Sequence, residues 1–580
     1  KNLYAPLKNN EYILDEMKRN KSTKKSLDNN ISLELNFQIL KNLKFSTRGS
    51  VFNNAHETRT TWDPGSYTAK LNNWLTGVYT ELPDELNRGA LAEGNSRSSG
   101  WTWRNNLEFR QAFKEKHFLS IYVGHEVSEY KSNSNYVRYP EYDPEKGLMG
   151  VPDIDGVEDV KKKILNLLDG LSESRNRSVS FFVSGSYSFL DRYVVAGSIR
   201  MDGADIIGTA NRFSPLWNAS FKYNVYEEGF MKKISWLDEL AFRLSYGYTG
   251  SIDKNALPFG VMTFMSTDEY FGYDIPTYIQ PKNPSVKWQK KEDRSVGVDF
   301  ALLNRRIRGT VNYYNNVTRN LLDTKNLPIS VGVSSIKYNS SSVRNYGWEF
   351  SMNSQVLRTR ELFWKVDFNV GMNKSKVIKT YYKDISEVPK GYDKTTPVEG
   401  ASTNAWFGYR FAGIDPRTGH TLAFVDNSER DKPVGYQRED GRWVLDMDDV
   451  VNKDRESIKE NLGNSYPTVN GGFRTNLAWK NFTFDANFTF MLGHKITAAY
   501  YATSAGGMVS SASQNVLRKE TTRWRKPGDI TDIPVYSAGG EFSSLYSEWY
   551  DLKLESGDFL KCTSISLGYR VPSKICQKFS

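Results

Sequence analysis

The chain has 580 residues, of which 14% are aromatic and 39% hydrophobic, and its formal net charge is +10. A soluble protein of this length would need several domains, because a single hydrophobic core seldom exceeds about 250–300 residues. The cations are scattered rather than gathered on a basic helix or patch, so we expect no nucleic-acid partner.

The sequence has no run of 18 or more apolar residues, so no transmembrane helix is predicted. The two cysteines, Cys562 and Cys576, are too few for a disulfide framework and lack metal-site spacing. Many aromatic residues with few aliphatic runs favour strands that present alternate residues to an apolar phase and to water.

A period of two in hydrophobicity begins near the start of the chain. From Ile31 to Ile39 every odd residue is apolar and every even residue is polar. Such alternation is typical of antiparallel strands with one apolar and one polar face. The same pattern recurs over residues 43–51, 179–189, 193–199, 296–302, 307–313 and 482–490.

The connections between these segments are unequal in length. Short polar turns close one end, at residues 41–42, 114–116, 190–192, 304–305 and 480–481. Long polar segments follow at the other end, at residues 54–100, 129–176, 251–290, 317–343 and 493–558. Outer-membrane barrels combine short periplasmic turns with long extracellular loops, so the sequence predicts an all-β fold, an antiparallel transmembrane β-barrel of roughly sixteen strands.

The sequence also bears on three details of this barrel: the strand parity of one segment, a short helix and the position of aromatic residues. The strand parity between residues 376 and 468 is not fixed by the pattern. Helical spacing over residues 157–171 predicts a short amphipathic helix on the extracellular side. Aromatic residues near strand ends, such as Trp101, Trp348 and Trp479, fit a girdle at the membrane–water interface, although ordinary sheet packing favours aromatics as well.

The sequence offers no enzymatic constellation. It has no His-Glu-x-x-His motif, P-loop, Gly-x-Gly-x-x-Gly or Gly-x-Ser-x-Gly. The acidic stretch at residues 446–454 lacks the central glycine of a calcium loop, so we interpret it as a solvated loop. We expect no catalytic, cofactor-binding or metal-binding residues, and no enzyme.

Several short motifs occur in a fixed order over residues 190–572. They are Arg200-Met201-Asp202-Gly203, Asn211-Arg212, Ser245-Tyr246-Gly247 with Thr249-Gly250, Asn283-Pro284 with Lys287-Trp288 and Glu292, Gly297 with Asp299-Phe300, Tyr313-Tyr314-Asn315, Asn345 with Gly347 and Glu349, Asn373-Lys374 with Lys376-Val377, Arg523-Trp524 with Lys526-Pro527-Gly528-Asp529, and Leu567-Gly568-Tyr569 with Pro572. In this order they resemble the SusC/RagA family of TonB-dependent transporters of Bacteroidetes. The first ~190 residues show only the general hairpin pattern.

The resemblance implies a 22-stranded barrel in the bacterial outer membrane, blocked by an N-terminal plug. It implies active import of oligosaccharides or peptides, with a SusD-like surface lipoprotein as a lid and TonB–ExbB–ExbD as the energy source. By this comparison residues 1–580 are the barrel domain, surrounded by outer-membrane lipid, and the plug and the final strands are expected to be absent. Polar residues on alternate strand positions are expected to line the lumen.

Substrate contacts are expected in the long loops, where aromatic faces can stack on sugar rings or pack on peptide side chains. The candidate substrate-binding residues are Trp62, Tyr67, Trp74 and Trp406. Energised import is the leading hypothesis. A passive outer-membrane porin or adhesin barrel and a soluble multi-domain β carbohydrate-binding protein are the alternatives.

Overall fold

The computed structural model describes most of the chain. The described residues are 17–63, 66, 89–140, 142–143, 147–148, 172–205, 212–251, 260–267, 274–280, 283, 286–326, 330, 335–388, 397–428, 430, 432–448, 455–497, 522–535 and 551–572. The expected helix at residues 157–171 and the candidates Tyr67 and Trp74 lie outside them. None of the helices in these ranges is long and apolar enough to cross a membrane.

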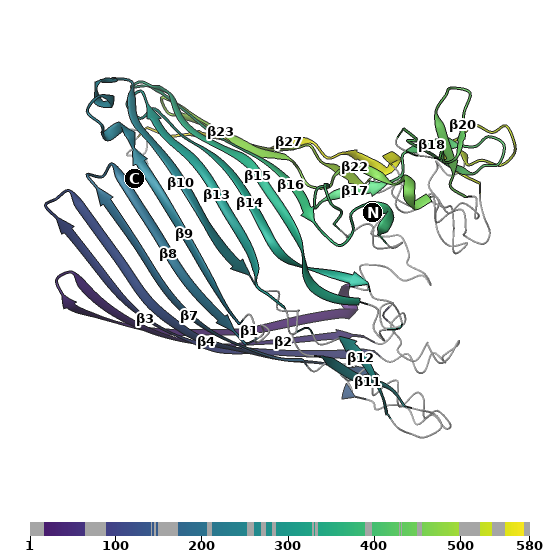
Figure 1. The fold of residues 1–580 in the computed structure, drawn as a ribbon, viewed down its shortest axis with the longest axis horizontal. Coiled ribbons are helices and arrows are strands. Elements are labelled where there is room, and N and C mark those ends of the chain that lie inside the picture. Colours follow the sequence, from purple (N-terminus) through teal and green to yellow (C-terminus); the bar gives the residue numbers. More distant parts are fainter. Residues whose placement is uncertain are drawn as a thin grey trace.

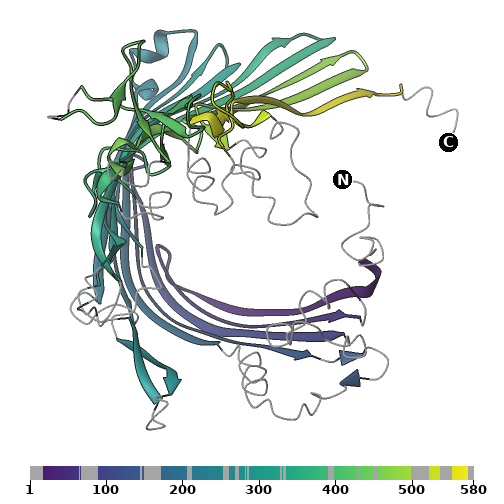
Figure 2. The same cartoon turned by 90° about the vertical axis from the view of Figure 1, so that its right-hand side faces the viewer.

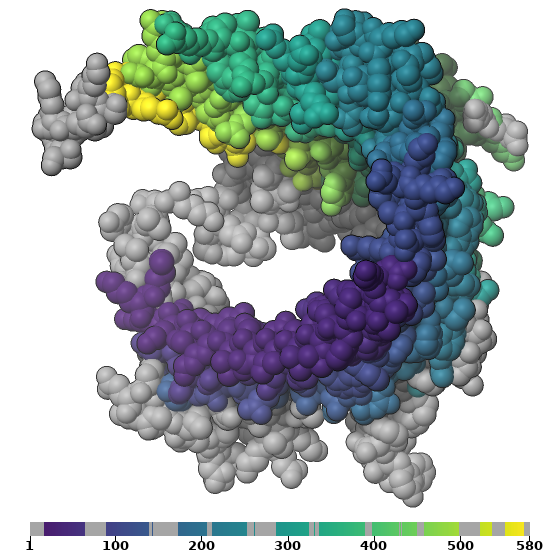
Figure 3. All heavy atoms as spheres, turned by 90° about the vertical axis from the view of Figure 1, so that its left-hand side faces the viewer, coloured from purple at the N-terminus to yellow at the C-terminus, as the bar shows by residue number. Residues whose placement is uncertain are grey.

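A single antiparallel sheet of fifteen strands makes up the wall of the molecule, and each strand pairs with the next one along the order (Figure 1). The strands of the wall are β1 (Asn20–Leu40), β2 (Leu43–Trp62), β3 (Ala90–Phe113), β4 (His117–Pro140), β7 (Ser172–Phe189), β8 (Tyr193–Ala204), β9 (Phe213–Asn224), β10 (Leu237–Ser251), β13 (Gln289–Leu302), β14 (Ile307–Asn326), β15 (Ser335–Arg358), β16 (Leu362–Lys379), β23 (Val469–Trp479), β24 (Phe482–Leu492) and β27 (Phe559–Tyr569). The wall curves so strongly that its two edge strands, β1 and β27, face each other across a hollow (Figures 2 and 3).

The alternation of residues gathers a continuous band of apolar side chains on one face of this wall, although Phe52 and Phe182 have the parity of the other face. Ile31 lies opposite Val51, and Val51 lies opposite Trp101 on the next strand. These side chains stay exposed within the chain, with Ile31 74% accessible. A slip of one residue would turn every one of them to the polar side, so the pattern fixes the register. We call this face the apolar face, and the opposite one the polar face.

The predicted short turns are confirmed, and those at residues 114–116, 190–192 and 304–305 have successive residues with positive φ. Leu190 and Asp191 have φ values of 56° and 55°, and Asn304 has a φ of 57°. Positive φ at successive central residues matches the right-handed twist of the flanking strands, which is why tight hairpins use it. These turns therefore lock adjacent strands together at one end of the wall.

The predicted long loops are shorter than expected because the strands run beyond the apolar band. β2 continues to Trp62 and β3 begins at Ala90, both inside the expected loop 54–100. Outside the band both faces meet water, so the hydrophobic alternation fades although backbone pairing continues. Smaller elements lie in these connections: β5 (Tyr142–Asp143), β6 (Gly147–Leu148), β11 (Val261–Thr267), β12 (Asp274–Gln280), β25 (Lys495–Thr497), β26 (Leu554–Ser556), η3 (Val225–Glu227), η4 (Met231–Lys233), η6 (Ile385–Glu387) and η9 (Asp551–Lys553).

Strand parity was left open over residues 376–468. The first four of these residues end β16, and the described residues from 380 to 468 add no further strand to the wall. β16 pairs directly with β23, and the residues between them form a separate small unit at the long-loop end (Figure 1). Its elements are β17 (Ala405–Gly408), β18 (Phe411–Ile414), β19 (Thr421–Phe424), β20 (Tyr436–Gln437), β21 (Trp443–Asp446), η7 (Arg455–Ile458) and β22 (Glu460–Asn464). We call these elements, together with residues 522–535 and 551–553 that contact them, the mouth unit.

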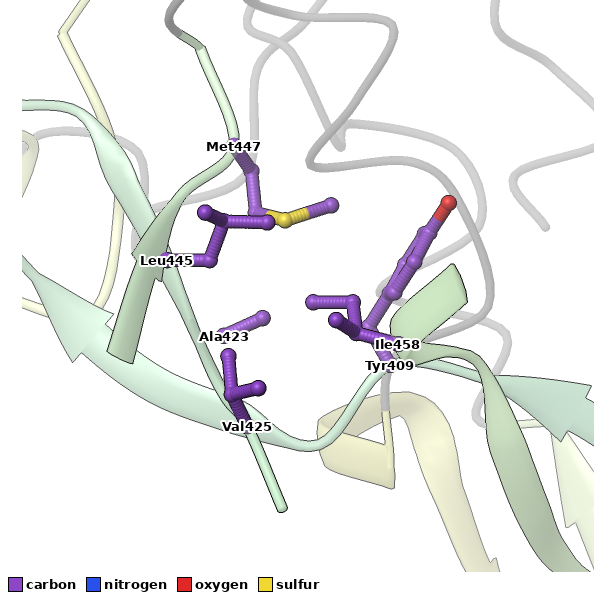
Figure 4. Packing of buried hydrophobic residues seen from close by; sticks show 6 residues of the cluster. All are labelled: Tyr409, Ala423, Val425, Leu445, Met447 and Ile458. Carbon is purple, nitrogen blue, oxygen red and sulfur yellow. The ribbon is translucent and has the colours of Figure 1, made fainter. Parts of the chain in front are cut away.

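The mouth unit has its own hydrophobic core. Tyr409, Ala423, Leu445, Met447 and Ile458 are buried together, with Val425 beside them (Figure 4). Leu552 of η9 packs against the same cluster, although it follows Ile458 by almost a hundred residues. Distant parts of the chain therefore close one core above the wall.

Candidate functional site

Hydroxyl groups pair across the strands on the polar face of the wall. Ser245 and Ser295 lie 2.7 Å apart between β10 and β13, and Thr310 and Ser351 lie 2.7 Å apart between β14 and β15. A hydroxyl can exchange its partner for water or for a polar solute, because it both donates and accepts. The face is therefore suited to a wet passage.

Ion pairs between arginine and aspartate side chains lie on the same face. The Arg243 Nη2 atom donates to Asp299 at 2.8 Å and to Asn312 at 2.9 Å. Arg474 donates to Asp485 at 2.9 Å. The arginines are about half exposed, so solvent screens each pair and its contribution to the stability of the fold is small. Their main effect is to present alternating charge along the passage.

The polar face is hollowed between β13 and β16, near the short turns. A groove of about 460 Å³ is lined there by charged and amide side chains, among them Asp299, Arg308, Asn353 and Asp367. Asn353 also hydrogen-bonds Asp367. The groove can therefore contact cationic, anionic and neutral polar groups of a solute.

Two of the four predicted substrate-binding residues lie in the described part of the chain. Trp62 ends β2 and has the strand parity of the polar face, opposite Ala90. Trp406 lies on β17 in the mouth unit, and its Nε1 donates to the Lys495 carbonyl at 3.1 Å. No strand pairing joins β2 to β17, so the structure does not assemble these tryptophans into one site through the sheet.

The acidic stretch at residues 446–454 was expected to be solvated, and this is wrong for Asp448. Its side chain is 2% exposed, and its Oδ2 atom accepts a hydrogen bond from the Thr421 amide at 2.7 Å. Asp446 is bound by His420 at 2.9 Å. The carboxylate of Asp448 is buried because β19 and β21 pair directly before it. Burial raises the pKa of Asp448 to about 6.

This buried carboxyl makes the stability of the mouth unit depend on pH. In the unfolded chain Asp448 ionises near its ordinary pKa of 3.8, below the folded value of about 6. The unit is therefore most stable when Asp448 is protonated, and it loses up to about 3 kcal/mol as pH rises from ~4 to ~6. Replacing Asp448 with asparagine should remove this dependence and protect the unit at pH 7.5.

Hydrogen exchange of β19 and β21 amides, measured for wild type and variant at each pH, checks the expectation. Asp440→Asn is the control, because Asp440 is exposed and its pKa is lowered by Arg442. Equal pH dependence in wild type and Asp448→Asn would show that this carboxyl is not the cause.

Contacts within the mouth unit, between the turn before β19 and residues 523–535, were not predicted from the sequence. Trp524 Nε1 donates a hydrogen bond to the Pro416 carbonyl, in the turn that follows Asp415, at 3.0 Å. Val535 donates to the Gly419 carbonyl at 2.9 Å. Pro416 and Gly419 are a turn signal that the sequence shows. The sequence does not show that this turn contacts residues more than a hundred positions further along the chain.

A curved antiparallel wall with an apolar and a polar face, short turns at one end and long excursions at the other defines an outer-membrane β-barrel. The family model described as TonB dependent receptor-like, beta-barrel matches residues 4–490, so the chain belongs to that family. This membership places the chain in the bacterial outer membrane and among receptors rather than enzymes, as expected from the sequence.

Similar proteins agree with this assignment. TonB-dependent receptor P26 of Formosa agariphila is 24% identical over 528 residues, which are 89% of this chain and 50% of that protein. TonB-dependent receptor SusC of Bacteroides thetaiotaomicron is 25% identical over 68% of this chain and 38% of its own length. The structure of the RagAB peptide transporter has a TM-score of 0.77 and 20% identity, covering 97% of this chain and 57% of that one.

The resemblance to the SusC/RagA family is therefore confirmed. The chain spans about half the length of the curated relatives it matches. The fifteen strands of the wall are close to the roughly sixteen expected from alternation.

Proposed function

We propose that this chain forms the wall of an outer-membrane importer that takes up oligosaccharides or peptides. The observation that carries the proposal is a polar face with paired charges and hydroxyls inside a TonB-dependent receptor barrel. We propose further that TonB–ExbB–ExbD supplies the energy and that a SusD-like lipoprotein covers the mouth.

The mouth unit supports the position of this lid. It stands at the long-loop end of the wall, where a surface lipoprotein would approach (Figure 1). Its fold is held by a core of its own rather than by the wall, so it can present a fixed surface. RagAB, which shares the fold, is a peptide transporter, and this supports peptides as one of the two cargo classes.

Aromatic contacts with the cargo are proposed at Trp62, Tyr67, Trp74 and Trp406. Trp62 is the strongest of these, because its strand parity points it to the polar face. Trp406 uses its N–H within the fold, so it would contact cargo through its ring. Stacking on an aromatic face suits a sugar ring and an apolar peptide side chain alike.

Uptake in the native host tests the proposal. The gene for the full-length protein is deleted, and uptake of a labelled oligopeptide pool and a labelled oligosaccharide pool is compared with the parent strain, with and without a protonophore. Energised import predicts that deletion and protonophore abolish uptake of the same pool. Uptake that requires the gene but survives the protonophore would identify a passive pore. Unchanged uptake of both pools in the deletion strain would contradict import of oligopeptides and of oligosaccharides by this protein.

A further inference from the structure

The apolar face of the wall is hollowed between β8 and β14. A groove of about 590 Å³ is lined there mostly by apolar side chains, including Val195, Ala219, Leu244, Val296 and Tyr313. Ala219 is the small residue of this lining, and Gly197, which lies opposite Ala219 on β8, lines a second groove of about 330 Å³. The groove therefore runs across several strands on the side of the wall that meets lipid.

Cationic side chains gather at one end of this groove. Arg294 lines it, and donates through Nε to Glu292 at 3.1 Å. Arg319 lies 3.8 Å from the other oxygen of Glu292, and Arg344 binds Asn315, another lining residue, at 2.8 Å. Two guanidinium groups thus face the Glu292 carboxylate and a third lies beside them on β15, so these four groups carry an excess of two positive charges.

The carboxylate orients this cluster. Glu292 is 4% exposed and also accepts the Tyr246 hydroxyl at 2.9 Å. Arg294 and Arg319 are more than half exposed. Their guanidinium groups are therefore held in place on the inner side and remain accessible on the outer side. A fixed fork of N–H donors of this kind matches the oxygens of a phosphate.

The cluster lies at the outer boundary of the membrane. Arg294 is eight residues from Leu302, the last residue of β13 before a short turn. At about 3.3 Å per residue and a tilt of about 40°, Arg294 is roughly 20 Å above the short-turn end. The apolar band of such barrels is about 25 Å tall, so the arginines lie near the headgroups of the outer leaflet.

We propose that this groove is a binding site for a phosphorylated lipid of the outer leaflet. One acyl chain lies in the groove over Ala219, and a headgroup phosphate is bound by Arg294, Arg319 and Arg344. A lipid fits both halves of the site, because the groove is apolar and its outer end carries uncompensated positive charge. The inference depends on the position of the wall in the membrane and not on the cargo.

The test uses the full-length protein purified in detergent and probed by native mass spectrometry. The probes are bisphosphorylated lipid A and the same lipid A after removal of its phosphates. Arg319→Gln is the first variant, because it leaves the Arg294–Glu292–Tyr246 contacts intact. We expect it to weaken binding of phosphorylated lipid A by roughly tenfold, as for loss of one charge-assisted hydrogen bond.

Two further variants make the result specific. Arg308→Gln removes the same charge from the same strand but on the polar face, so it should leave lipid binding unchanged. Ala219→Phe fills the groove and should weaken binding of both forms of lipid A. Equal losses of lipid A binding in Arg319→Gln and Arg308→Gln would overturn the proposal. Unchanged binding in Arg319→Gln, or unchanged binding in Ala219→Phe, would overturn it as well.

Discussion

Replacing Gly347 with alanine is expected to lower the free energy of unfolding of the barrel by about 3 kcal/mol or more. A Cβ atom at this position would lie 1.9 Å from the Met372 carbonyl oxygen on β16 and 2.8 Å from the Tyr314 hydroxyl. Tyr314 crosses the strand at this point to donate to Asn373 at 2.9 Å. A methyl group would therefore force apart two backbones and displace the tyrosine that covers the glycine.

The measurement is guanidinium unfolding of the protein in detergent, followed by the gel shift between folded and unfolded barrel. Gly371→Ala is the matched control, since Gly371 lies on the same strand pair and the same face. Its added Cβ would be 3.4 Å from the nearest atom, on Asn470, which the side chain can tolerate. Equal losses in both variants would mean that general strand propensity, and not the contact at Gly347, sets the cost.

Truncating Leu445 to alanine is expected to unfold the mouth unit while the wall stays folded. Leu445 is 2% exposed and packs among Tyr409, Val425 and Met447. Loss of such a buried side chain costs about 2–5 kcal/mol. A unit with so small a core has a stability of the same order, so local unfolding follows.

Hydrogen exchange measures the unfolding of the mouth unit and of the wall separately, because each amide reports on its own strand. Amides of β19 and β21 should lose protection in Leu445→Ala, whereas amides of β13 to β15 should keep it. Ile530→Ala is the control within the same unit, because Ile530 is 94% exposed. Loss of protection in β13 to β15 as well would show that the mouth unit and the wall unfold together.

The wall could be predicted from the sequence because its signal is repeated and local. Alternation from Ile31 to Ile39 defines a strand and its apolar face without reference to any other segment. The short turns were equally visible, as at Asp191 and Asn304, since polar residues interrupt the pattern there. Strand ends were predicted less well, because alternation depends on the membrane and stops where the membrane stops.

The mouth unit and the sites could be predicted only in part. Strands of four residues, such as β19 and β21, are too short for a period to show. The buried state of Asp448 arises from their pairing, so a string of acids gave the wrong expectation. The groove under Arg294 requires the register of several strands at once, and no single strand carries that information.

The direct pairing of β16 with β23 makes the wall independent of the length of the segment between these two strands. Eleven residue pairs join the two strands, although residues 380–468 intervene. Closing a loop of roughly 90 residues rather than four costs only about 3 kcal/mol more, because loop entropy grows with the logarithm of length. A change in the length of the inserted segment should therefore cost the pairing of β16 with β23 little free energy.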